Sequence, residues 1–339
     1  MITLVDTTLR DGSYRVGFGF TGAQTFALVQ GLEAVGIPAV EAGHGLGLGA
    51  WRAPGIASAE DDLTYMQAAR MAARNAKVGV FAMPKFAVES DIDAAAEAGM
   101  DFIRIGMDAA RYEQGEALVR RARANGLHTL GFLMKSYTLP VEELRIAAPR
   151  IAEWGADGFL IVDSAGGMTP DSVRAYVRAV IETTGKPCGF HGHNNLELAV
   201  GNAFAAVEAG ATILDASLKG LGRSSGNASL EALTAALNRA GHETGIDPVK
   251  LARLADKHVR NADLAEWNEA DLVQGMAYVH SGMQDRIDAL AADYSLDPAA
   301  LTLAAGAALG GLDLTDDQLA AVARDLAGHA DIEEERAVG

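Results

Sequence analysis

This 339-residue sequence is poor in several residue types, and each shortage excludes a class of protein. Its one cysteine, Cys188, cannot form an internal disulfide, so a disulfide-stabilised scaffold is excluded. Lys and Arg number 28 against 45 Asp and Glu, and the formal net charge of −17 would repel nucleic acid. No apolar run is long enough to span a membrane, and early charges such as Asp6 interrupt any signal-peptide pattern. We therefore expect a cytoplasmic protein that binds neither nucleic acid nor a membrane.

Apolar residues are plentiful, at 49%, and they recur in a regular pattern. Short β-rich runs alternate with longer amphipathic segments through roughly the first 240 residues. Strands that are apolar throughout and joined by helices predict a parallel sheet buried on both faces. Eight such units match the size of a (β/α)8 TIM barrel. A doubly wound open sheet is the alternative, but no Gly-rich phosphate loop follows the first strand. The expected strands are 2–6, 39–43, 77–82, 102–105, 129–133, 158–162, 188–191 and 213–217.

The last part of the chain carries helical patterns and no further strand signal. We predict a barrel domain over 1–245, a small helical domain over 246–330 and an acidic flexible tail over 331–339. The expected C-terminal helices are 274–292, 297–308 and 315–327.

His191 and His193 stand at the end of the seventh expected strand. Side chains two apart on a strand point to the same face, so both imidazoles are aimed at one point. Asp11 follows the first strand, and only the eighth strand separates the first from the seventh in a closed barrel. Two imidazoles and one carboxylate suit a divalent ion such as Mn²⁺, Fe²⁺, Co²⁺ or Zn²⁺. A His-x-His pair alone is a weak signal, and a purely structural pair is the alternative.

Other polar residues collect after the expected strands, at the end of a TIM barrel where chemistry takes place. This placement predicts a polar cavity at the carboxyl ends of the strands. The residues are Glu41, His44, Arg104, Lys135, Ser136, Asp163, Ser164, Asp215 and Ser217.

Several motifs together resemble one enzyme family. They are Thr8-Leu9-Arg10-Asp11-Gly12, Glu41-Ala42-Gly43-His44-Gly45, His191-Gly192-His193-Asn194-Asn195 and Gly220-Leu221-Gly222-Arg223-Ser224-Ser225-Gly226-Asn227. The chain is similar to the metal-dependent pyruvate aldolases related to hydroxymethylglutaryl-CoA lyase, and most of all to the 4-hydroxy-2-oxovalerate aldolases. The resemblance implies cleavage of a 4-hydroxy-2-oxo acid to pyruvate and an aldehyde.

The same resemblance implies roles for individual residues. Asp11, His191 and His193 would bind the divalent metal, usually Mn²⁺ with Mg²⁺ or Co²⁺ as alternatives, and Asn227 adds a ligand in some members. Arg10 would contact the 2-oxo oxygen of the substrate, where an always-charged guanidinium stabilises the enolate that forms. From the residues alone, Arg10 could instead pair with a barrel carboxylate, and Asp11 could cap a helix or loop.

Two positions depart from the family pattern. The aldolases carry a His three positions after the metal-binding Asp, as the base for the C4 hydroxyl, and a Tyr from the C-terminal region; this chain has Tyr14 and His280 there. We predict a hydrogen-bonded dyad with His280 as the base, because an imidazole titrates near neutral pH and a phenol near pH 10. The alternative is that His280 is an ordinary helix residue and Tyr14 only shapes the pocket.

The remaining expectations concern substrate contacts. Ser164 is expected to bind the substrate carboxylate, Glu41 to bond Arg10 or a ligand, and His191 to contact the substrate besides the metal. His44 is a candidate substrate contact as well, and it would otherwise support the metal site or pack under its loop. Lys135 suggests a Schiff-base aldolase, but a full set of metal ligands argues against that.

Two other functions stay open on the sequence. A Claisen-type synthase acting on an acyl-CoA and a 2-oxo acid is disfavoured by the short, helical C-terminal part. A non-catalytic binding subunit is kept open by Tyr14 and opposed by the intact metal ligands. As partners, the family implies an acylating aldehyde dehydrogenase docked on the helical domain, and a homodimer is equally compatible.

Overall fold

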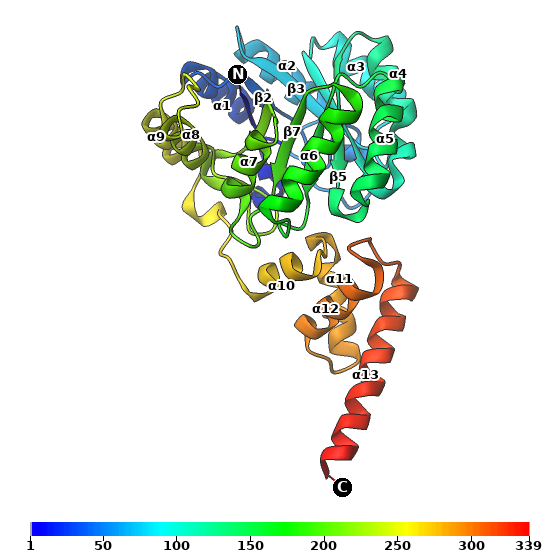
Figure 1. Cartoon of the computed structure of the whole chain (residues 1–339). Coiled ribbons are helices and arrows are strands. Elements are labelled where there is room, and N and C mark those ends of the chain that lie inside the picture. The colour runs from blue at the N-terminus through cyan, green and yellow to red at the C-terminus, as the bar shows by residue number, and fades with distance from the viewer. Residues whose placement is uncertain (1, 339) are drawn as a thin grey trace.

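The structure is a computed structural model that describes residues 2–338 (Figure 1). Eight strands form a closed barrel in which every neighbour is parallel, and β1 pairs with both β2 and β8. The TIM-barrel prediction is thereby confirmed and the open sheet excluded. The strands are β1 Thr3–Asp6, β2 Ala39–Glu41, β3 Lys77–Ala82, β4 Phe102–Asp108, β5 His128–Met134, β6 Gly158–Asp163, β7 Cys188–Gly192 and β8 Ile213–Ala216.

Helices surround the barrel, and local sequence signals set their ends (Figure 1). Thr21 forms a capping box with Gln24 at the start of the first helix, and Thr169 caps a helix that opens with Pro170. Gly185 ends that helix in the left-handed conformation, with φ of 63°. The helices are α1 Gly22–Ala34, α2 Asp62–Ala72, α3 Glu89–Glu97, α4 Glu116–Ala124, α5 Val141–Trp154, α6 Pro170–Thr184, α7 Ala199–Glu208, α8 Leu230–Arg239 and α9 Pro248–His258. Short 3-10 helices are η1 Asp11–Val16, η2 Ala50–Arg52, η3 Ala109–Gly115, η4 Ser136–Thr138, η5 Leu218–Gly220, η6 Asn261–Asp263 and η7 Ser281–Met283.

The barrel strands bury both faces. Along β6, Phe159 and Ile161 pack in the main core with residues of the surrounding helices. Leu160 and Val162, which alternate with them, pack in a separate cluster with Phe132. This alternation follows from the two-residue period of a strand, and it places an apolar layer inside the barrel.

The C-terminal helices lie below the barrel in Figure 1 and have an apolar cluster of their own, with Ile287, Leu301 and Leu319 fully buried. The sequence prediction of one long helix over 274–292 is wrong, because Tyr278 takes a left-handed φ of 54° and ends the first part. Helix α13 continues through residues 331–338, where the sequence predicts a flexible tail. These helices are α10 Glu269–Ala277, α11 Gln284–Asp293, α12 Pro298–Leu309 and α13 Asp316–Val338. Among the described residues, no helix combines the length and apolar character needed to cross a membrane.

Candidate active site

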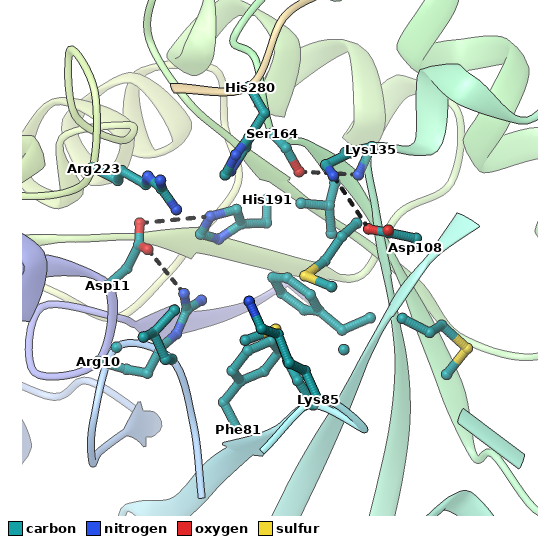
Figure 2. A pocket seen from close by; sticks show the side chains of 18 of the residues that line it. Arg10, Asp11, Phe81, Lys85, Asp108, Lys135, Ser164, His191, Arg223 and His280 are labelled. Atoms are coloured by element: carbon teal, nitrogen blue, oxygen red, sulfur yellow. Dashed lines mark hydrogen bonds and ion pairs between the residues drawn. The ribbon is translucent and has the colours of Figure 1, made fainter. Parts of the chain in front are cut away.

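A cavity of about 300 Å³ opens at the carboxyl ends of the strands (Figure 2). Its apolar wall continues the barrel interior through Phe132 and Val162. Loops after the strands supply most of the polar wall, while His280 and Asp313 reach it from the C-terminal helices. Pockets of this size hold small molecules. The polar lining comprises Arg10, Asp11, Tyr14, Lys85, Asp108, Gln114, Lys135, Ser164, His191, His193, Arg223, His280 and Asp313.

Asp11, His191 and His193 meet at one side of this cavity. Each offers a ligand atom, these atoms all lie within 4.8 Å of one another, and all three residues are buried. The distant segments that the sequence analysis linked are therefore brought together. A carboxylate oxygen and two imidazole nitrogens form a donor set that fits a divalent transition metal.

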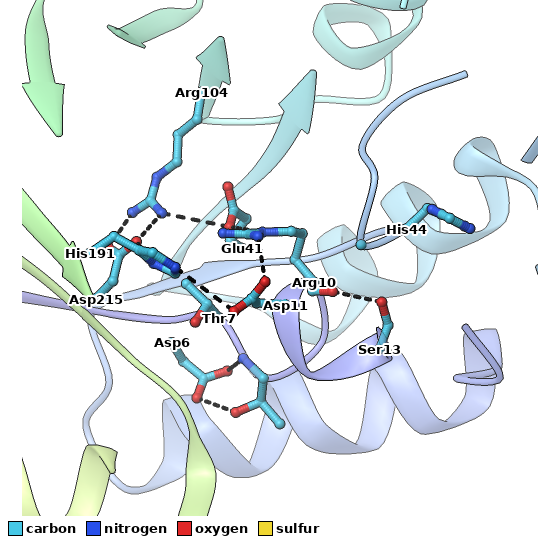
Figure 3. Close-up of polar contacts among 12 residues, drawn as sticks. Asp6, Thr7, Arg10, Asp11, Ser13, Glu41, His44, Arg104, His191 and Asp215 are labelled. Atoms are coloured by element: carbon cyan, nitrogen blue, oxygen red, sulfur yellow. Dashed lines mark hydrogen bonds and ion pairs between the residues drawn. The ribbon is translucent and has the colours of Figure 1, made fainter. Parts of the chain in front are cut away.

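Hydrogen bonds at Nδ1 determine which nitrogen of His191 and of His193 faces the cavity, and Figure 3 shows those around His191. Nδ1 of His191 lies 2.9 Å from Asp215 Oδ2, and Arg104 holds Asp215 with two bonds of 2.6 and 2.7 Å. Nδ1 of His193 lies 3.2 Å from the backbone oxygen of Arg223. Both partners are acceptors, so Nδ1 carries the proton and Nε2 keeps its lone pair for a metal.

The protonation states also suit metal ligation. Burial alone would raise the pKa of Asp11, but Arg10 and the two imidazoles outweigh burial and hold this pKa well below its ordinary value. Burial lowers the pKa of His193 to about 4. At neutral pH the carboxyl is therefore ionised and His193 is neutral, as metal ligands must be.

Asn227 adjoins the same cluster. Its Nδ2 donates to Asp11 Oδ2 at 2.6 Å, while its buried Oδ1 has no hydrogen-bond partner among the described residues. An oxygen left without a partner is costly to bury, so it fits the place of a further metal ligand.

Hydrogen bonds also hold the Arg10 side chain, but one of its nitrogens, Nη2, has no partner in the described part of the chain. Its Nε donates to Glu41 Oε2 at 2.6 Å and its Nη1 to Asp11 Oδ1 at 2.9 Å. Its guanidinium carbon lies 4.9 and 5.5 Å from the ring centres of Phe81 and Phe132. Nη2 is buried without a partner in the described part of the chain. Glu41 therefore bonds Arg10, as the sequence analysis expected, and Nη2 is left for an oxygen of a bound molecule.

His44 packs in its own loop. Its Nε2 bonds the backbone oxygen of Ala57 at 2.9 Å, its Nδ1 accepts from Leu46 N–H at 3.1 Å, and its ring stacks on Phe18. Both ring nitrogens are thus used, and His44 is not among the described residues that line the cavity. The geometry favours packing over the expected substrate or metal role.

Ser164 and Lys135 lie on the other side of the cavity. The backbone N–H of Lys135 donates to Ser164 Oγ at 2.9 Å, which leaves the hydroxyl proton available to a ligand. The Lys135 ammonium pairs closely with Asp313 and lies 3.5 Å from Asp108. A Schiff base needs a free amine, so these ion pairs argue against that chemistry.

Tyr14 and His280 both face the cavity but do not form the expected dyad. The Tyr14 hydroxyl donates to the backbone oxygen of Gly45 at 3.3 Å, and His280 Nδ1 accepts from Gly282 N–H at 3.2 Å. No hydrogen bond joins these two described side chains. Burial and then the nearby Arg223 and Lys135 lower the pKa of His280 well below its ordinary value, whereas burial raises the pKa of Tyr14. Both are therefore neutral near pH 7.

Sequence reasoning gave no role to some residues of the cavity. Arg223 belongs to the quoted glycine-rich motif, so its position in a barrel loop could have identified it. Asp108 ends β4, but the expected strand stopped at residue 105, and Lys85 and Asp313 stand in segments without any pattern that would single them out.

Comparisons with known proteins agree with this geometry. The family model described as HMGL-like matches residues 1–257. The chain belongs to the HMGL-like family. Members depend on a divalent metal, and the cluster of Asp11, His191 and His193 is the candidate site for it here.

Two similar relatives carry the same name. The 4-hydroxy-2-oxovalerate aldolase of Carboxydothermus hydrogenoformans is 39% identical over 76% of this chain and 77% of that protein. That of Moorella thermoacetica is 37% identical over 88% of each chain. Among solved structures, the carboxyl transferase domain of Rhizobium etli pyruvate carboxylase has a TM-score of 0.77 and 18% identity over 96% of this chain and 59% of that chain. At this identity the structural likeness shows the fold alone.

Proposed function

We propose that this protein is a divalent-metal-dependent aldolase that cleaves a 4-hydroxy-2-oxo acid to pyruvate and an aldehyde, and runs the reverse condensation. The observation that carries the proposal is that Asp11, His191 and His193 meet beside the free nitrogen of Arg10 in one cavity. Relatives that cover most of the chain and bear the name of this aldolase support it.

Asp11, His191, His193 and the Oδ1 of Asn227 would hold the metal, and we propose Mn²⁺, with Mg²⁺ or Co²⁺ as alternatives. Bound there, the ion supplies a Lewis acid for the C1 carboxylate and 2-oxo oxygen of the substrate. The hydroxyl of Ser164 donates to that carboxylate from the opposite side.

Arg10 stabilises the charge that develops in the reaction. Breaking the C3–C4 bond leaves an electron pair that becomes an enolate with its charge on the 2-oxo oxygen. Nη2 of Arg10 donates to this oxygen, while Glu41 and Asp11 keep the guanidinium in place. Because the donor is already oriented, no reorganisation is needed as the charge forms.

His280 takes the proton of the C4 hydroxyl as the aldehyde carbonyl forms. Its neutral ring accepts at Nδ1, so protonation there displaces the Gly282 N–H. Tyr14 orients the hydroxyl and excludes water from it. Exchange of the two residue types thus keeps an imidazole and a phenol on the cavity wall, although they come from swapped positions.

The alternatives are not favoured. Relatives named as aldolases support neither the Claisen-type synthase nor a non-catalytic subunit. A small 2-oxo acid is the substrate class, while the aldehyde dehydrogenase partner, the homodimer and a cytoplasmic location stay predictions.

The test is pyruvate release from a panel of 4-hydroxy-2-oxo acids by purified protein, with Mn²⁺ and with chelator. We expect release that is lost with chelator and restored by Mn²⁺. Asp11→Asn should lose both bound metal and activity, whereas the surface variant Arg178→Gln should keep both. Release that is indifferent to chelator, or no release from any member, would contradict the proposal.

A further inference from the structure

The charges in the cavity are not all neutralised. Of its basic side chains, Arg10 pairs with Asp11 and Glu41, and Lys135 pairs with Asp108 and Asp313. Arg223 and Lys85 also line the cavity, yet in the described part of the chain neither has a carboxylate within 4 Å. The chain has 45 acidic residues, yet none of them neutralises these two cations in the described part of the chain. Their positive charge therefore favours an anionic ligand in the cavity.

Hydrogen bonds fix the backbone of Arg223 in its loop. Its backbone oxygen accepts from His193 Nδ1 at 3.2 Å and from Gly226 N–H at 2.9 Å. The next residue, Ser224, has a left-handed φ of 55° and donates to Asp271 Oδ1 at 2.9 Å. With the backbone anchored, only the side chain has to become ordered when an anion binds.

The Arg223 guanidinium adjoins the two residues assigned to the C4 hydroxyl. Its central carbon lies 5.0 Å from the ring centre of Tyr14. A methyl group built on Gly282, beside His280, would come within 2.7 Å of one of its terminal nitrogens. Arg223 therefore faces the part of a substrate that lies beyond C4, which becomes the aldehyde.

Figure 2 places Arg223 on the side of Asp11 and His280, and Lys85 on the opposite wall with its ammonium turned toward the space between them. Lys85 is exposed and lies against Phe86, with its Nζ 5.2 Å from that ring. It is therefore less firmly held than Arg223 and serves as an attracting charge rather than a fixed contact.

We propose that the natural substrate is a 4-hydroxy-2-oxo acid whose aldehyde half carries an anionic group, a carboxylate or a phosphate, bound by Arg223 with Lys85 assisting. The proposal rests on the aldolase function proposed above. The planar guanidinium can bind either anion through two parallel N–H donors. The 2-oxo acid end does not need Arg223, because the metal ligands, Arg10 and Ser164 face that end.

The experiment measures condensation of pyruvate with matched aldehydes by the Mn²⁺-loaded enzyme. 4-Oxobutanoate is compared with pentanal, and glycolaldehyde phosphate with 4,4-dimethylpentanal, so that the two members of a pair differ in charge while their sizes are similar. We expect the anionic member of at least one pair to be preferred in kcat/KM, and the better pair identifies the anion.

Variants then assign the preference to a residue. Arg223→Gln should lower kcat/KM for the preferred anionic aldehyde by roughly ten- to hundredfold, the value of one charged hydrogen bond, and leave its neutral partner nearly unchanged. Lys85→Gln, at an exposed position, should give a smaller loss in the same direction. Arg178→Gln on α6 removes the same charge away from the cavity and should change neither rate. Bound Mn²⁺ and circular dichroism verify that each variant is folded.

Three outcomes separate the ideas. Preference for neutral aldehydes with no effect of Arg223→Gln overturns the anionic substrate while the aldolase stands. An equal loss for anionic and neutral aldehydes overturns it too, because Arg223 would then serve the shared 2-oxo acid end. No condensation with any aldehyde overturns the aldolase function itself.

Discussion

Replacing Asp215 by asparagine tests how the metal site is held. Asp215 accepts two hydrogen bonds from Arg104 and one from His191 Nδ1, and Arg104 is fully buried. An amide has one accepting oxygen and no charge, so Asp215→Asn leaves the buried guanidinium with Glu41, 3.6 Å away, as its remaining carboxylate. Breaking such a pair costs about 3–5 kcal/mol of unfolding free energy, and the remaining accepting oxygen favours the lower end.

The same substitution also acts on the metal. Without a carboxylate at Nδ1, the proton of His191 is free to move to Nε2, the nitrogen that should face the ion. Loss of such a supporting partner lowers metal affinity by roughly ten- to hundredfold. We would titrate metal-free protein with Mn²⁺, following free Mn²⁺ by electron paramagnetic resonance, and measure urea unfolding in parallel.

Two further variants serve as controls for the effect of Asp215→Asn on Mn²⁺ affinity. Arg104→Met destabilises the fold but keeps the bond from His191 to Asp215, so its Mn²⁺ affinity should match the wild type. Asp62→Asn makes the same chemical change at a buried carboxyl in the first turn of α2, outside the cavity lining, and should also leave the affinity unchanged. If Asp215→Asn bound Mn²⁺ as tightly as Arg104→Met, the bond from His191 Nδ1 to Asp215 would not be what prepares His191 to bind the metal.

Three further outcomes are expected. Arg10→Lys should lower kcat by roughly a hundred- to a thousandfold while bound Mn²⁺ is retained, since one oxyanion donor is lost; unchanged kcat would remove Arg10 from the enolate step. His280→Ala should lower kcat by roughly a hundredfold or more with bound Mn²⁺ retained, and near-normal turnover would contradict a base at this position. Burial raises the pKa of Asp62 to about 6, so the folded protein binds this proton more tightly than the unfolded chain, and its stability falls as pH rises from about 4 to 6. In urea unfolding at pH 7, the free energy of unfolding of Asp62→Asn should therefore exceed that of the wild type by about 3 kcal/mol, and the difference should disappear at pH 4. A difference that does not change with pH would contradict this pKa.

Strand periodicity was sufficient to predict the barrel, because each strand is buried on both faces and separated from the next by a helix with its own end signals. The meeting of Asp11 with His191 and His193 followed from strand order alone. These features depend on local pattern and on one closed topology, and both can be read along the chain.

The region around His280 could not be predicted in the same way. A left-handed Tyr278 breaks the helical pattern without a glycine or proline to mark it, and this break turns His280 toward the cavity. The hydrogen bonds of His44 and Tyr14 could not be predicted either. His44 bonds the backbone oxygen of Ala57 and Tyr14 that of Gly45, and such contacts between loops leave no periodic signal in the sequence.

The ion pair between Lys135 and Asp313 joins a barrel loop to the segment between α12 and α13, next to the cavity that His280 enters. The proposed metal ligands and Arg10 all belong to the barrel, whereas the proposed base belongs to the appended helices. Electron withdrawal and proton removal are thus assigned to separate parts of the polypeptide. Sequence change around His280, between α10 and η7, can therefore alter proton removal during evolution without disturbing the metal ligands or Arg10.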